Sequence, residues 1–547
     1  MLGAFVLLAW GALAFGAVYP WAYGPLLVGA GAIGATGLTL HARPAVPVSL
    51  LAGLLLVSAA ISIQLVPLDP GTLTRVSPST DAFLKEYDVS YRAAALVAAL
   101  DATQKSAIQI ASVRTTHPLS IAPSRTWLGL AFVVCLGTFF LGLIAVFSIT
   151  PARPLAASLV TLGLVLALVG IIQKPFYSPD PVTGLVSDTA KIYGFWTPQL
   201  RGSNPFGPFV NGNHFAGWMI MALPLGLGYF CGRAGKAIGG VQSDWRQRVL
   251  WFSSTEANLL MLLAMALLLM SVSIVLTLSR AGIACFIVAL ALMGLWALAG
   301  LGRISRKLLA VAGFLLLSVI VISWVGVDTI AWRFLDTDWV HWNERREPWI
   351  DAMHIVRAFP LVGTGFNTYG VATLLYQTTR LQLHFAEAHN DYLQIVAEGG
   401  LLVAVPVAGT ILLFVREVWR RFRAHADDPM TYWLRAGAVT GIVAIALQEV
   451  VDFSMQIPGN AVLFATLAAL AVHRAPIPPT VVASESDRKR SRRTDSRHHS
   501  RRTLPTTRPA SRPIRRGVTP ASSEPPPSAH AVVGDPERLV DQRLAEA

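Results

Sequence analysis

Apolar stretches of transmembrane length recur along this chain and leave few folds open to it. A helix that crosses a bilayer needs roughly 20 consecutive, mostly apolar residues, and we count about twelve such stretches. Only 14% of the 547 residues are charged. The pattern predicts an all-α, polytopic membrane protein of about 12 transmembrane helices. The predicted spans lie near residues 3–19, 23–40, 46–66, 126–148, 154–173, 214–231, 257–278, 281–300, 308–326, 400–415, 434–450 and 458–473.

Basic residues in the short connections set the expected orientation, because cytoplasmic loops are enriched in Lys and Arg. Alternate connections carry them, and the basic C-terminal tail falls on the same side, so we expect both termini in the cytoplasm. Three long connections, 67–125, 174–213 and 327–399, then face the opposite, outer side. The first stretch follows no basic region, which favours a retained helix over a cleaved signal peptide. The connecting basic residues are Arg43, Arg153, Arg233, Lys236, Arg246, Arg248, Arg303, Arg306, Lys307, Arg416, Arg420, Arg421 and Arg423.

The C-terminal segment 474–547 differs in composition from the rest. It is rich in Pro, Ser and Thr and contains basic runs such as SDRKRSRRTDSRHHSRR. Such a segment cannot bury a core, so we predict a disordered basic cytoplasmic tail. A polybasic segment beside a bilayer is attracted to anionic lipid; nucleic-acid binding is the alternative that its membrane context disfavours. The three cysteines, Cys135, Cys231 and Cys285, are far apart, and we infer neither a disulfide nor a metal cluster.

Polar and aromatic residues gather in the outer connections and at the helix ends beside them. In LRGSNPFGPFVNGNHFAGWMI, from Leu200 to Ile220, Gly and Pro predict an irregular loop that ends at Asn213 and His214, just before a span. Asn211 or Asn213 is a candidate cap for that helix. One interpretation is a re-entrant loop with an interfacial His; the other is a pocket wall that binds a polar ligand.

Two apolar stretches meet with almost no loop between them at Ser279 and Arg280, within LTLSRAGIAC. This hairpin points outward in the predicted topology. Arg280 either extends to lipid phosphate or points inward at an anionic substrate. A guanidinium matches phosphate oxygens with two parallel hydrogen bonds, which suits a diphosphate.

A further outer motif is NERREPWIDAMHIVRAFPLVGTGFNTYG, from Asn343 to Gly370. Its spacing predicts a short amphipathic helix over 348–358, ended by Pro360, Gly363 and Gly365, with Arg345 just before it. The predicted apolar face is Trp349, Ala352, Met353 and Val356. The charged run ERRE in this motif is interpreted either as a solvated cluster of charges or as part of a functional site. Asp336 and Asp338 form a D-x-D pattern that sometimes holds a divalent ion, which is weak evidence by itself.

The stretch AEAHNDYLQIVAEGG, from Ala386 to Gly400, brings a His to the mouth of a span. His389, Tyr392, Leu393 and Val396 are predicted to share one helical face. His suits proton transfer near neutral pH, although a lone interfacial His is more often structural. A functional role is favoured by its polar neighbours, together with the carboxylates of LQEVVDFSMQIPGN, which can orient the His or bind sugar hydroxyls. These residues are Asn390, Asp391, Glu398, Gln448, Glu449 and Asp452.

Taken together, these motifs resemble the O-antigen ligase/polymerase superfamily of bacterial membrane glycosyltransferases. The resemblance covers roughly residues 200–470. It rests on NHFAG at 213–217, SRAG at 279–282, RREPW…P..G.G over 345–365 and AHNDYLQ..AE.GL at 388–401, followed by D…..P.N…F..L from Asp452. THPLSIAPSRTW, upstream of the fourth span, is similar too. Together with the composition, the resemblance divides the chain into three regions: N-terminal helices 1–199 with the long periplasmic loop 67–125, a catalytic membrane region 200–473 that includes the large, partly helical periplasmic loop 327–399, and the tail 474–547.

Family members transfer a glycan from undecaprenyl diphosphate to an acceptor hydroxyl on lipid A–core, a growing glycan or a protein. The resemblance implies a site facing the periplasm from the bacterial inner membrane, with no cofactor and no metal. By position it implies His389 as the essential His, Arg280 and Arg345 as the essential arginines, and Arg201 as a further candidate. Asn213, His214, Asn390, Asp391, Glu449 and Asp452 are the candidates for orienting or binding the substrates. The loop 67–125 and the tail are longer than the family's shared core.

The expected chemistry is an inverting displacement in which arginines stabilise the diphosphate and a neutral His389 accepts the acceptor's proton. The motifs do not separate a ligase from a polymerase. A flippase or transporter of lipid-linked glycans is the main alternative, which predicts charged residues distributed through the spans. The third hypothesis is a sensor or scaffold with a basic cytoplasmic tail. This hypothesis leaves the outer Arg and His residues without a role.

Overall fold

The computed structural model describes residues 1–40, 46–99, 116–176, 191–198, 204–239, 251, 253–300, 339–378, 384–424 and 428–474. The described chain is mostly helical and belongs to one compact unit, Met1–Ile477. The predicted span 308–326, residues 475–547 of the tail, Arg201, Asp336 and Asp338 lie outside the described residues. The division at residues 199 and 200 stays a prediction.

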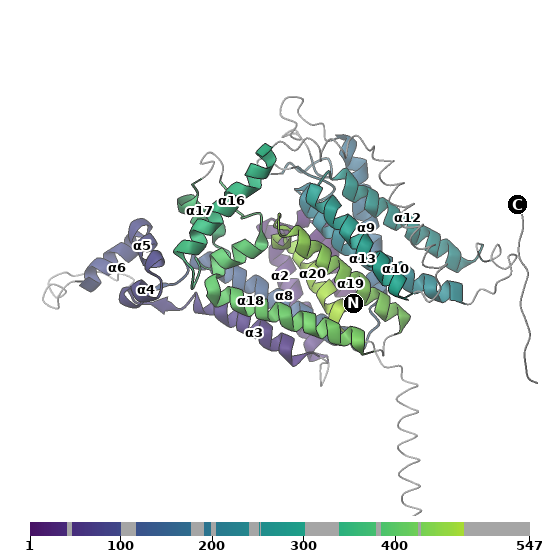
Figure 1. Ribbon diagram of the computed structural model, residues 1–547, viewed down its shortest axis with the longest axis horizontal. Coiled ribbons are helices and arrows are strands. Elements are labelled where there is room, and N and C mark those ends of the chain that lie inside the picture. Colours follow the sequence, from purple (N-terminus) through teal and green to yellow (C-terminus); the bar gives the residue numbers. More distant parts are fainter. Residues whose placement is uncertain are drawn as a thin grey trace, which may run out of the picture. The chain divides into compact units, whose positions relative to one another are not determined.

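Each predicted span within the described residues falls on a helix (Figure 1). Seven of these helices are long and apolar enough to cross a membrane, so the chain is a polytopic membrane protein; the predicted number of twelve spans stays a prediction. The seven are α8 (Pro123–Phe147), α9 (Arg153–Gln173), α10 (Gly212–Gly239), α12 (Thr255–Leu276), α13 (Arg280–Gly300), α18 (Asp391–Arg423) and α19 (Pro429–Gln448). The remaining apolar helices are α1 (Leu2–Leu13), α2 (Pro20–Thr39), α3 (Val48–Ile63) and α20 (Pro458–Val472).

The first helix is shorter than predicted. It ends at Leu13 instead of continuing to residue 19, and the short 3-10 turn η1 (Phe15–Ala17) follows. Phe15 and Ala17 have φ of 60° and 56°, in the left-handed region that no continuous α-helix contains. Apolarity alone does not show such a break, because the residues of the turn are as apolar as those of the helix.

Hydrogen bonds between neighbouring helices define two ends of the bundle. At one end, Gln448 Nε2 donates to the Asn213 carbonyl (3.1 Å), Asn460 Nδ2 to the His214 carbonyl (3.0 Å) and the Asp391 amide to the Glu449 carbonyl (3.1 Å). The starts of α10, α18 and α20 and the end of α19 therefore lie together. We call this the His389 end.

The opposite ends of the same helices meet elsewhere. Arg435 Nε, near the start of α19, donates to the Ala471 carbonyl at the end of α20 (3.0 Å). Arg233 Nη2, near the end of α10, pairs with Glu256 at the start of α12 (2.7 Å). We call this the Arg435 end. Successive helices therefore alternate in direction from α10 through α13 and from α18 through α20.

Small residues let several of these helices approach closely, as is common in membrane bundles. Gly34 of α2 and Gly142 of α8 lie backbone to backbone, so neither position has room for a side chain. Gly437 of α19 lies in the same way against the Pro224 carbonyl of α10. Trp218 of α10 is fully buried in the core, against Gly163 of α9.

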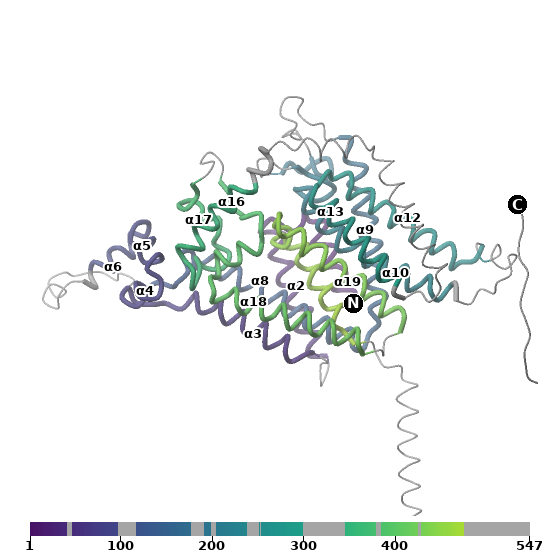
Figure 2. The backbone as a smooth tube through the Cα atoms, in the orientation of Figure 1, coloured from purple at the N-terminus to yellow at the C-terminus, as the bar shows by residue number. Residues whose placement is uncertain are grey.

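Two groups of shorter elements lie at the His389 end. The first comprises β1 (Pro67–Leu68), α4 (Pro70–Val76), α5 (Pro78–Tyr87), α6 (Val89–Ala99) and β2 (His117–Pro118), with β1 and β2 antiparallel. Leu73, Leu84, Tyr91 and Leu119 form its own small core. The second comprises α16 (Trp339–Ala358) and α17 (Tyr369–Tyr376), which lie beside the start of α18 (Figure 2). The short turns η2 (Lys174–Phe176) and η3 (Ser454–Gln456) complete the described elements at this end.

Helix α16 confirms the predicted helix but is longer and buries a different face. Arg345 lies inside it and not before it, because Arg and Glu are good helix formers and the helix continues through Pro348. Ala352 and Ile355 are fully buried, whereas Met353, predicted on the apolar face, is 39% exposed. The helix ends at Ala358, ahead of Pro360, as predicted.

Helix α18 is broken near its start, at the pair Gly399–Gly400. Gly400 has φ 54° and ψ −162°, a conformation outside the helical region. The break frees the amides of Leu401 and Leu402, which donate to the Pro360 and Leu361 carbonyls at 3.0 and 2.9 Å. The loop after α16 is therefore attached to the membrane helix through its backbone.

Candidate active site

His389 lies in the connection immediately before α18, not on the helical face predicted for it. Helix α18 begins at Asp391, because Asn390 caps it: Asn390 Oδ1 accepts from the Leu393 amide at 2.9 Å. His389 itself has a left-handed φ of 51°. The cap changes the direction of the backbone, so the His389 side chain does not continue the row of Tyr392, Leu393 and Val396.

Residues from three distant segments surround His389. Its ring meets the Phe453 ring edge to face, with centroids 4.8 Å apart, and Phe453 meets the buried His214 ring in the same way, also at 4.8 Å. Trp349 Nε1 donates to the His389 carbonyl at 3.3 Å. Trp349 is one helical turn after Arg345 on α16, so the helix that carries Arg345 contacts the His389 connection directly.

Arg280 begins α13 after a tight hairpin, as the sequence predicts. Helix α12 ends at Leu276, and Leu278 takes a left-handed φ of 57° in the turn. Ser279 Oγ accepts from the Gly282 amide at 3.2 Å and so caps α13. A side chain at Gly282 would lie only 2.6 Å from Cβ of Ala216. The first turn of α13 is therefore packed against the first turns of α10, which carry His214.

The carboxylates near His389 belong to one network, in which Glu449 and Asp452 are buried and Asp391 is partly buried. Asp391 and Glu449 face each other, and Gln456 Nε2 donates to Asp391 Oδ1 at 2.7 Å. Burial, followed by the Asp391 carboxylate beside it, raises the pKa of Glu449 far above its usual range, so Glu449 carries a proton at neutral pH. Asp452 is also buried, and it accepts from the Phe453 amide at 2.9 Å and so helps to fix the ring beside His389.

Glu398 connects the loop after α16 to α18. Its carboxylate accepts from the Asn367 amide (2.6 Å), the Tyr369 amide (3.0 Å) and Gln394 Nε2 (3.1 Å). The Glu398 carbonyl accepts from Gln64 Nε2 at 2.9 Å. Glu398, predicted only as a polar neighbour of His389, therefore positions this loop against α18.

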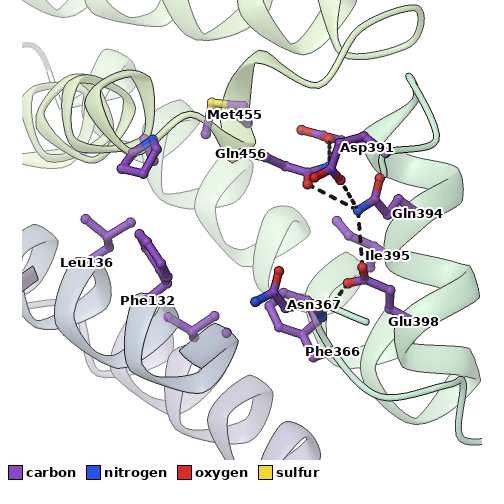
Figure 3. A pocket seen from close by; sticks show the side chains of 15 residues that line it. Phe132, Leu136, Phe366, Asn367, Asp391, Gln394, Ile395, Glu398, Met455 and Gln456 are labelled. Carbon is purple, nitrogen blue, oxygen red and sulfur yellow. Dashed lines mark hydrogen bonds between the residues drawn. The ribbon is translucent and has the colours of Figure 1, made fainter. Parts of the chain in front are cut away.

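A cavity of about 300 Å³ opens beside this network, between α8, the start of α18 and the η3–α20 connection. Figure 3 shows Phe132 and Leu136 of α8 on one side of it and Gln394 and Glu398 of α18 on the other. Of the predicted site residues that the structure describes, Asp391 lines this cavity and the others do not. His389 lies two residues before Asp391 in the chain.

Several predicted residues have other positions or roles. Asn211 is the residue that caps α10, since its Oδ1 accepts from the Asn213 amide at 2.9 Å. Asn213 takes part through its carbonyl, which binds Gln448. Arg201, Asp336 and Asp338 lie outside the described residues. Within the described ranges, the His, Cys, Asp and Glu side chains form no group of three or more arranged to hold a metal ion.

Several residues that build this end of the molecule were not among the predicted site residues, and Trp349 was predicted only as part of an apolar face. Gln64, Trp349, Gln394, Phe453 and Gln456 make the contacts described above. Gln394 and Gln456 lie inside motifs that were noted for their charged residues, so their polarity was a usable signal. Gln64 is separated from Glu398 by 334 positions, and no local pattern indicates such a contact.

Comparison with known proteins identifies part of this region. Residues 265–408 match the sequence model of the O-antigen ligase family. The match includes Arg280, Arg345 and His389, but not Asn213, His214, Glu449 or Asp452. No curated protein matches the chain significantly.

Proposed function

We propose that this chain, a membrane enzyme with an O-antigen ligase domain at residues 265–408, transfers a glycan from undecaprenyl diphosphate to an acceptor hydroxyl. The observation that carries the proposal is the arrangement at the His389 end. His389 is fixed against Phe453 and Trp349, while helices that bear Arg280 and Arg345 contact the same cluster of segments. In this proposal the His389 end faces the periplasm of a bacterial inner membrane.

The diphosphate is the part of the donor that needs stabilisation. As the bond between the sugar C1 and the diphosphate oxygen breaks, that oxygen keeps the electron pair and negative charge builds on the leaving group. Arg280 and Arg345 are proposed to bind it, because guanidinium groups pair with phosphate oxygens bidentately. Helices α10, α13, α18 and α20 also begin at this end, and the positive ends of helix dipoles favour anions.

The acceptor hydroxyl needs a base, and His389 is proposed to supply it. The hydroxyl oxygen attacks C1 from the face opposite the diphosphate while its proton passes to the neutral imidazole, so the displacement inverts C1. No metal ion is required in this proposal. The left-handed backbone of His389 and the aromatic contact with Phe453 support the proposal, since both restrict the ring to one orientation.

The test is turnover of the purified protein in detergent with an undecaprenyl diphosphate-linked glycan and candidate acceptors. We expect His389→Ala to lower undecaprenyl diphosphate release by about 10²- to 10⁴-fold, the usual contribution of a general base. The matched control is His384→Ala, in the same connection but exposed, which should leave the rate unchanged. Melting temperature and elution volume should be the same for both variants.

Two results would count against this proposal. A normal rate for His389→Ala would remove the proposed base. Loss of activity with a chelator, restored by a divalent ion, would contradict a metal-independent displacement and direct attention to Asp336 and Asp338.

A further inference from the structure

The cavity beside Asp391 has two walls of opposite character. One wall, on α8 and the loop after α16, is apolar and includes Phe132, Leu136 and Phe366. The other consists of Glu387, Asp391, Gln394, Glu398 and Gln456, which we call the amide–carboxyl wall. Such a combination suits a ligand with an apolar face and a polar edge.

Hydrogen bonds fix the amide–carboxyl wall. Gln394 Nε2 lies 2.7 Å from Glu387 Oε2, 3.1 Å from Glu398 Oε1 and 3.1 Å from Gln456 Oε1. Gln456 in turn donates to Asp391, and the Ala388 amide donates to Gln394 Oε1 at 2.9 Å. The wall is therefore preorganised, so a ligand does not have to order these side chains when it binds.

The charge of the wall indicates which ligand fits. Burial raises the pKa of Glu387 to about 8, with Glu398 and Asp391 adding to the effect and Gln394 and Arg125 opposing it. Glu387 therefore holds a proton at neutral pH and offers an O–H donor. None of the lining residues that the structure describes is Lys, Arg or His. A diphosphate would meet carboxyl groups there without a cation to balance it.

We propose that this cavity is the subsite for the acceptor, and that the acceptor is an uncharged sugar ring whose hydroxyl groups bind the amide–carboxyl wall. The C–H face of the ring lies on Phe132 and Phe366. The assignment rests on the proposed function and deepens it, since it selects a glycan acceptor over the hydroxyl of a polypeptide. The volume of about 300 Å³ is at the small end of ligand pockets, which fits a sugar unit and not a polyprenyl chain.

The position of the cavity agrees with this assignment. Asp391 lines it, and Gln456, three residues after Phe453, donates to Asp391 Oδ1 at 2.7 Å. The Phe453 ring in turn meets the His389 ring. An acceptor held here lies next to the proposed base. The donor's diphosphate is assigned to the arginines, outside the cavity, so the two substrates approach His389 from different sides.

The test fills the cavity without removing a polar group. Ala461 of α20 lines it, and Ala461→Phe places a ring inside. Ala408→Phe is the matched control, because Ala408 is exposed on α18. A second variant, Gln456→Ala, removes one polar partner without adding bulk. The donor is the lipid-linked glycan of the source organism; the acceptors are the oligosaccharide released from it by mild acid and, separately, the core oligosaccharide of lipopolysaccharide.

We expect Ala461→Phe to raise the KM for the acceptor at least about tenfold and Gln456→Ala to raise it about two- to tenfold, as the loss of one hydrogen bond implies. The KM for the donor should stay the same in both, as should both KM values in Ala408→Phe. If the donor KM rises instead, the cavity holds the donor's sugar and the assignment is wrong.

Other outcomes are equally decisive. Unchanged acceptor KM in Gln456→Ala would overturn the assignment even if Ala461→Phe did not fold. Transfer to a Ser- or Thr-containing peptide, with no transfer to either oligosaccharide, would overturn the choice of a sugar. Failure of the unaltered protein to release undecaprenyl diphosphate would overturn the proposed function itself, and so can be told apart from the results above.

Discussion

A left-handed backbone at His389, with φ of 51°, is a conformation that residues other than Gly adopt only when neighbours hold them there. Here the Trp349 indole binds the His389 carbonyl at 3.3 Å, and the Asn390 cap begins the next helix. The sequence pattern had placed Asn390 only as a polar neighbour of His389, and the predicted helical row through His389 took no account of a cap at Asn390. Capping residues therefore deserve priority over helical periodicity where the two conflict.

At the residue scale, Arg280→Lys separates the two interpretations of Arg280. An ammonium keeps the charge but cannot form two parallel hydrogen bonds with a diphosphate. If the side chain binds the leaving group, we expect turnover at saturating donor to fall at least about tenfold, which corresponds to about 1.4 kcal/mol of lost transition-state stabilisation. Arg75→Lys, at an exposed position of α4, is the control. A normal rate for Arg280→Lys would favour an Arg that extends to lipid phosphate.

At the scale of elements, the apolar stretches predicted where the helices lie, because a membrane span depends on local composition. What local composition could not predict is how the elements contact one another. The pair Gly399–Gly400 was noted as the start of a span, but the docking of Pro360 and Leu361 on the break of α18 depends on residues some forty positions apart. The helices α4–α6 also depend on tertiary burial, since Leu73, Leu84 and Tyr91 meet Leu119 across the loop.

Gly400→Ala tests whether this docking holds the loop after α16 in place. A Cβ at Gly400 would lie 2.5 Å from the Gly363 amide nitrogen, in a backbone with φ of 54°. Such strain costs about 1–3 kcal/mol, so we expect a lower melting temperature and faster hydrogen exchange at Leu401 and Leu402. Gly409→Ala, on the same helix with open space around it, should raise stability by about 1 kcal/mol. Equal protection of Leu401 and Leu402 in both variants would contradict the proposed role of the break.

For the whole molecule, two independent patterns agree. Basic residues in alternate connections predicted that successive spans reverse direction. The contacts at the His389 and Arg435 ends show such reversals from α10 through α13 and from α18 through α20. Neither pattern alone locates the site: the proposed residues His214, Arg280, Arg345 and His389 are far apart in sequence, and only the alternation of helix direction brings their segments to one end. The sequence could therefore predict which residue types to consider, whereas their neighbours follow from the packing of the bundle.

Accessibility of single cysteines tests the orientation of the two ends. The three native cysteines, Cys135, Cys231 and Cys285, are first replaced by Ala. In that background, Ser90→Cys labels α6, which belongs to the group of short elements at the His389 end. Lys236→Cys labels α10 near the Arg435 end. Both positions are exposed. If the His389 end is periplasmic, a membrane-impermeant maleimide should label Ser90→Cys in intact spheroplasts and label Lys236→Cys only after the membrane is permeabilised. The reverse labelling would put His389 on the cytoplasmic side, where the proposed transfer to a periplasmic acceptor cannot take place.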